Sequence, residues 1–283
     1  MSNNQNEGIS KHFYSAGLSD VQVQNLLTGI AKMRADERSF SEYFGENWAP
    51  AFELSEGFYI LISRAGSDYS KYVSSLTEDI TENKVNTYTA LSRLYTRAAQ
   101  QYLEILTLVK NGFSDGAFAR WRSMYELFVI VSFIHKFGEA VAEKFIEASE
   151  SEDRYDWAME SGVFPENKRH VTFGDILKHC DIDADVWKEN YTVANQTVHA
   201  SPQGTFGRLG AQDGKKQLSL RSGYGIAAPA IHCANTLALI SSMFFSVFPE
   251  EKTMDKMSLA AKLLDELTTV YCDIHDSLFP DEE

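Results

Sequence analysis

Three polar side chains spaced by four residues could form one chemically useful helix face: Tyr191, Asn195 and His199. Each step of four residues turns only about 40° around an α-helix, so all three would lie on one side. A hydroxyl, an amide and an imidazole can hold an anion or transfer a proton. We treat Asn195 and His199 as candidate catalytic residues and Tyr191 as a candidate binding residue. The alternative is that His199 caps a helix C-terminus, where the helix dipole favours a cation.

A second candidate pair, Arg122 and Glu126, lies within the apolar segment WRSMYELFVIVSFI. The spacing of four residues favours an ion pair, and an unpaired charge buried in so apolar a helix would cost several kcal/mol. The pair is therefore either structural or functional. In the functional interpretation both residues are catalytic candidates: Arg122 faces a pocket, and Glu126 orients Arg122 or His199. Arg120, in the same turn, is a further cation that could bind an anion.

Residues 202–225 predict a long glycine-rich loop with basic side chains after the polar helix face. Irregular segments of this length in compact domains tend to carry function or to move. Ser201 at its start and Arg208 within it are candidate binding residues, and the loop could cover the site of His199. The segment GTFGRLG has no preceding strand and no Lys-Ser/Thr, so it does not match a phosphate-binding loop.

The segment ARWRSMYELFVI, Ala119–Ile130, with the following AEKFIE and the later YTVANQTVHASP, Tyr191–Pro202, resembles the bacterial domain-of-unknown-function family 5677. Family members carry an Arg-x-x-x-Glu helix before a Tyr…His-x-Ser/Pro segment. The resemblance covers about residues 85–245. It implies a helical domain and brings no activity with it.

A looser resemblance links YTVANQTVHAS to HEPN helical bundles, many of which are metal-independent ribonucleases. Their signature of Arg, a polar residue and a later His corresponds here to Ala194, Asn195 and His199. The resemblance implies that His199 takes part in attack of a 2′-hydroxyl on the phosphodiester, in a site completed across a homodimer. Because Ala194 replaces the Arg, Arg122 or Arg208 would have to stabilise the developing charge, or the site only binds.

Helical periodicity over most of the 283 residues, with 44% hydrophobic and 12% aromatic residues, predicts an all-α bundle of about eight helices. We expect an N-terminal helical annex over residues 1–84 and a main bundle over 85–283. The expected segments are an amphipathic one over 20–44, an aromatic-rich one over 48–72, and helices over 85–110, 114–135, 138–160, 172–180, 183–201, 226–248 and 255–279. Ser114 or Asp115, Thr172, and Asp183 or Asp185 are the predicted N-terminal caps.

The net charge of −14 argues against bulk nucleic-acid binding, although residues 163–224 hold eight Lys/Arg against seven Asp/Glu. Three widely spaced cysteines and a polar N-terminus favour a cytoplasmic protein without a disulfide framework. The apolar run 226–248, broken by Pro229, His232 and Asn235, predicts a buried helix and no membrane contact. We expect no metal site and no cofactor.

Two functions remain open on these grounds. The first is a HEPN-like ribonuclease or nucleotide-cleaving effector in bacterial stress or phage defence, with RNA or a nucleotide as substrate and a second copy of the chain as partner. The second is a non-catalytic interaction or sensor protein that binds a small anion or a protein partner in the same pocket.

Overall fold

The computed structural model describes residues 11–151, 153–199, 202–206 and 221–280. Its contacts divide the chain into two compact units, one up to Asn47 and one from Trp48 onward. Every regular element in these ranges is a helix, which confirms the all-α class. The elements are α2 (Asp20–Ser74), α3 (Glu78–Thr81), η1 (Glu82–Lys84), α4 (Val85–Lys110), α5 (Ser114–Phe137), α6 (Glu139–Glu147), η2 (Ala148–Glu150), α7 (Asp156–Glu160), α8 (Phe173–His179), α9 (Ala184–Val198), α10 (Pro202–Phe206), α11 (Ala227–Phe245) and α12 (Glu251–Leu278).

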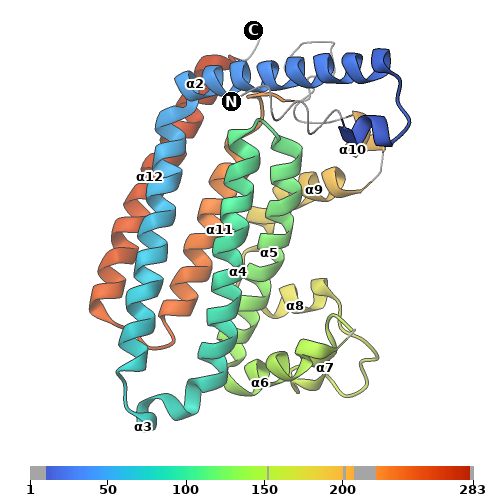
Figure 1. Cartoon of the computed structure of the whole chain (residues 1–283). Coiled ribbons are helices and arrows are strands. Elements are labelled where there is room, and N and C mark those ends of the chain that lie inside the picture. Colours follow the sequence, from blue (N-terminus) through green and yellow to red (C-terminus); the bar gives the residue numbers. More distant parts are fainter. Residues whose placement is uncertain (1–10, 152, 200–201, 207–220, 281–283) are drawn as a thin grey trace. The chain divides into compact units, whose positions relative to one another are not determined.

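The centre of the second unit is formed by α4, α5 and α11, which contact one another, while α12 packs on α11 (Figure 1). α5 buries apolar side chains around most of its circumference, as its sequence predicts for a central helix. α9 and α8 pack on the outer side of α5, and α6 contacts both α4 and α5. The helices that carry the candidate residues are thus part of this packed centre or lie directly against it.

Residues 48–74 of α2 belong to this bundle, because buried tyrosine hydroxyls connect them to other helices. Tyr102 of α4 donates to the Ser55 carbonyl at 2.9 Å, and Tyr69 donates to the Phe244 carbonyl at 3.2 Å. Each bond satisfies a polar group that burial would otherwise leave unpaired. The annex predicted over residues 1–84 therefore differs from the contact-defined unit, which ends at Asn47.

Among the described residues, α11 is long and apolar enough to cross a membrane by length and composition alone. More than half of the apolar stretch (56%) is buried inside the protein, and the helix contacts α4, α5 and α12. The core helix of a soluble protein can have the same length and apolar composition. The packing of α11 is that of the buried helix predicted from its sequence.

Several predicted helix ends shift in the structure. α5 begins at Ser114 itself, with Phe113 at the cap position and no side-chain cap bond, so the predicted Ser114 or Asp115 cap is wrong. The helix predicted to reach residue 160 ends at Glu147, because the chain passes through η2 and becomes extended at Ser151 before α7. The loop predicted from residue 202 begins with α10, and residues 207–220 lie outside the described residues.

Candidate functional site

The candidate site lies between α5 and α9, and aromatic packing sets the position of α9. Trp187 of α9 stacks on Trp121 of α5, with ring centroids 6.1 Å apart, and Tyr191 lies 5.1 Å from Tyr125. The helix starts at the Asp183 cap, whose side chain accepts the Asp185 N–H. These contacts fix which face of α9 meets α5.

The predicted ion pair between Arg122 and Glu126 is present, with Arg122 Nη2 3.0 Å from Glu126 Oε1. The side chains are 24% and 8% exposed, so both charges are largely withdrawn from water. Arg122 also donates from Nε to Asn195 Oδ1 at 2.5 Å. Two of the sequence candidates on α5 therefore meet one on α9, and the arginine is held in a single orientation.

Tyr191, one turn before Asn195 on α9, contacts both Arg122 and Glu126. Its hydroxyl donates to Glu126 Oε1 at 3.3 Å, and its ring lies under the Arg122 guanidinium, 5.5 Å from ring centroid to Cζ. Burial, and next the neighbouring Glu126 charge, raise the pKa of Tyr191 above its ordinary value. The hydroxyl accordingly stays protonated at neutral pH and acts as a donor.

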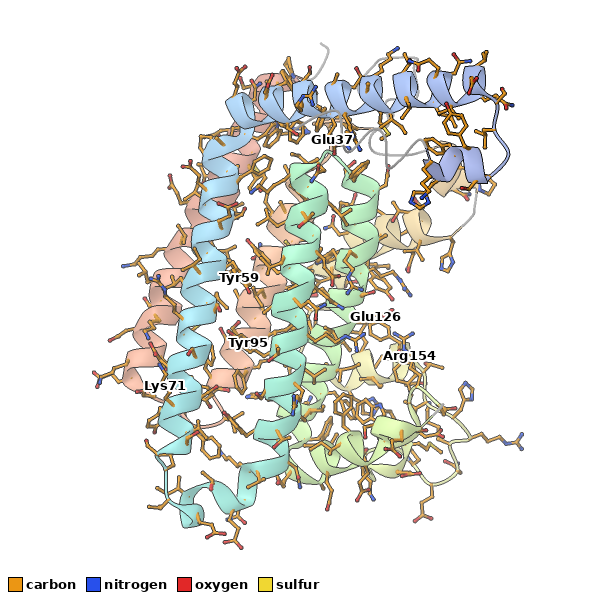
Figure 2. The ribbon with its side chains drawn as sticks, viewed as in Figure 1. Glu37, Tyr59, Lys71, Tyr95, Glu126 and Arg154 are labelled. Carbon is orange, nitrogen blue, oxygen red and sulfur yellow. The ribbon has the colours of Figure 1, made fainter. Side chains whose placement is uncertain are left out.

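Arg154, between η2 and α7, is a member of the site that the sequence analysis missed. Its Nη2 pairs with Glu126 Oε2, and the two residues lie close together in Figure 2. Because Arg122 pairs with Oε1, the buried carboxylate has a guanidinium on each oxygen. Glu126 could have predicted a second cation, because a buried carboxylate needs more than one donor. We call Arg122, Glu126, Arg154, Tyr191 and Asn195 the Arg122 cluster.

His199 lies one turn beyond Asn195, at the C-terminal cap position of α9. Its backbone N–H donates to the Asn195 carbonyl at 3.2 Å, and its conformation there is extended. The imidazole is exposed and makes no hydrogen bond or ion pair with another described residue. His199 is thus next to the Arg122 cluster along the helix but is not held by it.

The remaining candidates fall outside the Arg122 cluster. Arg120 pairs through Nε with Glu104 of α4, because it projects from the side of α5 that faces α4. Ser201 and Arg208 lie outside the described residues. Within the described ranges, no group of three or more His, Cys, Asp or Glu side chains could hold a metal ion, and the cysteines are free.

The charge and donors of the Arg122 cluster are of the kind that suit an anion. A guanidinium has five N–H donors, and the contacts of Arg122 to Asn195 and Glu126 engage only Nε and one N–H of Nη2. Two guanidinium groups face one carboxylate, so the Arg122 cluster keeps an excess of positive charge in an acidic protein. A phosphate or carboxylate group would find an oriented donor there.

Residues 88–168 match the model of the family of unknown function DUF5677. No match was found among curated proteins or among solved structures. The matched stretch runs from within α4 through α7 and includes Arg122, Glu126 and Arg154, whereas Tyr191, Asn195 and His199 lie beyond it. Residues 88–168 are thus similar to DUF5677, a family of unknown function, and the predicted resemblance is confirmed over this stretch.

Proposed function

We propose that this protein is a HEPN-like, metal-independent ribonuclease or nucleotide-cleaving effector of bacterial stress or phage defence, acting in the cytoplasm as a homodimer. One observation carries the proposal: Arg122 Nε is hydrogen-bonded to Asn195 Oδ1. The HEPN-like pattern has an arginine where this chain has Ala194. Arg122 places a guanidinium on the same part of α9 from a different helix, and this contact supports its role as the substitute cation.

In the proposed reaction, the neutral imidazole of His199 takes the proton of a ribose 2′-hydroxyl. The 2′-oxygen forms a bond to phosphorus as the bond from phosphorus to the 5′-oxygen breaks, which leaves a 2′,3′-cyclic phosphate. The departing 5′-oxygen receives a proton from water or from a second His199. Arg122 stabilises the charge that develops on the phosphate oxygens, and Glu126 holds Arg122 in place.

The exposure of His199 supports the proposed homodimer. Its imidazole is exposed and has no described partner that would fix its orientation, as a general base requires. A second copy of the chain packed against the end of α9 would supply that surface and would place two His199 side chains near one substrate. Mass measurement in solution tests the dimer separately from the chemistry.

The test is cleavage of RNA by the purified full-length protein and in cells that express it. We expect His199→Ala to abolish both RNA cleavage and growth arrest, and Arg122→Ala to reduce cleavage by about 100-fold or more, as loss of one charge-stabilising donor does. His170→Ala is the matched control, because His170 is exposed and is not part of the Arg122 cluster. Cleavage that persists unchanged in His199→Ala would refute the proposed mechanism.

The alternative is a non-catalytic sensor that binds a small anion or a protein in the Arg122 cluster. The specific observation in its favour is that Arg122 and Arg154 both already pair with Glu126, while His199 contacts neither in the described structure. A wild-type protein that leaves RNA and nucleotides intact, as a dimer and in cells, would favour this function.

A further inference from the structure

A cavity of about 540 Å³ lies beside the Arg122 cluster, on the other side of Arg154. It is open to solvent on one side and is lined by α4, the end of α6, η2, the segment that follows η2 and the start of α7. Its lining residues are Thr89, Ala90, Arg93, Phe145, Ile146, Ala148, Ser149, Ser151, Asp153, Arg154 and Trp157. None of the sequence candidates is among them.

One wall of this cavity is apolar and rigid. Phe145 and Trp157 meet edge to face, with ring centroids 5.1 Å apart, and Ala90 is buried on α4. The Trp157 indole N–H donates to the Arg154 carbonyl at 3.1 Å, which ties the aromatic wall to the backbone of the charged residue. Such a wall can bury an aromatic or aliphatic body against preformed surface.

The lining also carries positive charge. Arg93 is exposed on α4 and makes no hydrogen bond or ion pair with another described residue. Arg154 uses Nη2 for Glu126, which leaves Nε and Nη1 available. The one carboxylate among the lining side chains, Asp153, already accepts the Tyr155 N–H at 3.0 Å. Neither Arg93 nor Asp153 has an ion-pair partner among the described residues, and the two guanidinium groups of the lining outnumber its one carboxylate.

We propose that this cavity binds a small organic anion with an aromatic or apolar body. Its carboxylate, phosphate or sulfonate would pair with Arg93 and accept from Arg154, and its body would lie against Phe145 and Trp157. The volume is in the range of about 300–1,000 Å³ typical of small-molecule sites, and an apolar pocket with a few converging polar groups has their usual composition. The inference does not depend on RNA cleavage.

The test uses 1-naphthyl phosphate as the probe and titration calorimetry on the full chain. We expect saturable one-to-one binding that weakens as salt is raised, since an ion pair at the rim is screened. Arg93→Ala should weaken binding about tenfold or more, whereas Arg97→Ala should not. Arg97 is the matched control because it is also exposed on α4 and is not part of the lining.

Two further measurements distinguish binding in this cavity from non-specific binding of the probe. Thr89→Trp, which fills the cavity from an exposed lining position, should abolish binding while the far-ultraviolet circular dichroism stays unchanged. Uncharged 1-naphthalenemethanol should bind at least tenfold more weakly than the phosphate. The inference would be overturned if the probe failed to bind at millimolar concentration, if Arg93→Ala bound it as tightly as the wild type, or if the uncharged compound bound equally well.

Discussion

His232 is a half-buried histidine whose protonation should destabilise the protein. It lies on α11 with its ring 5.1 Å from Trp121 and 6.1 Å from Trp187, centroid to centroid. Burial lowers the pKa of His232 from the ordinary 6.5 to about 4, with no neighbouring charge contributing. Trp187 belongs to α9, so the same aromatic contact supports the helix that carries Tyr191 and Asn195.

The magnitude follows from the difference between these two pKa values. The full effect is about 3 kcal/mol, at about 1.4 kcal/mol for each pH unit. Between pH 4 and 6.5 the unfolded chain binds a proton at His232 that the folded protein does not bind, so stability rises with pH. The contribution is fully present above pH 6.5 and is lost as the pH falls towards 4. Between about pH 7 and about pH 4.5, protonation of His232 should lower the free energy of unfolding by about 2 kcal/mol.

The assay is urea unfolding at several pH values, with the wild type compared against His232→Leu. Lowered carboxylate pKa values, such as that of Asp175 beside Lys168, also reduce stability in acid, but they do so in both proteins. We expect the wild type to lose about 2 kcal/mol more than His232→Leu between about pH 7 and about pH 4.5. Parallel pH profiles would refute the reasoning, and His170→Leu, at an exposed histidine, should reproduce the wild-type profile.

Three further perturbations test the packing and the Arg122 cluster, each by urea unfolding. Gly66→Ala should cost about 1–3 kcal/mol, because its Cβ would lie 2.3 Å from the Tyr95 hydroxyl oxygen and displace a buried hydrogen-bond donor. Thr172→Ala should cost about 1 kcal/mol, since it removes the hydroxyl that accepts the Asp175 N–H in the capping box of α8. A double-mutant cycle of Arg122→Ala with Glu126→Gln should give a coupling energy of about 1–3 kcal/mol, because both side chains are mostly buried.

Each of these perturbations has a matched control. Gly57→Ala should be neutral or stabilising, because its Cβ would meet only Leu263 at 4.0 Å. Thr172→Ser should keep most of the cap. For the ion pair, a cycle of Arg120→Ala with Glu126→Gln should give no coupling, because Arg120 pairs with Glu104. The role of the Gly66 contact would be contradicted if Gly66→Ala were as stable as Gly57→Ala. The role of the cap would be contradicted if Thr172→Ala left the free energy of unfolding unchanged, and that of the ion pair if the effects of the Arg122 and Glu126 substitutions were additive.

Local signals predicted the parts of this fold that depend on neighbouring residues. The predicted bounds of α4, Val85 to Lys110, match the structure, because Asn111-Gly112 stops the helix and Gly112 takes a φ of 72° that favours glycine. The Thr172 cap is confirmed for the same reason, since its partner Asp175 is three residues away. The Arg122–Glu126 pair also follows from helix geometry alone.

Local sequence patterns could not predict the contacts between segments that lie far apart in the sequence. Asn195 meets Arg122 across 73 positions in the sequence, and Arg154 meets Glu126 across 28. No periodicity within one helix encodes such a contact. It depends on how Trp187 packs α9 against α5, and on where the chain turns after η2. Tertiary packing therefore decided which candidate cations reach the site.

Glu126 explains why the two proposed anion sites should influence each other. Its two carboxylate oxygens hold Arg122 towards α9 and Arg154 towards the cavity that Arg93 lines. An anion bound at either guanidinium competes with Glu126 for that cation, and the carboxylate then interacts more strongly with the other one. Because linkage is reciprocal, occupation of the cavity should change the affinity of the Arg122 cluster for a phosphate by the same factor as the reverse. Glu126→Gln removes the shared charge, so this variant should bind both anions independently.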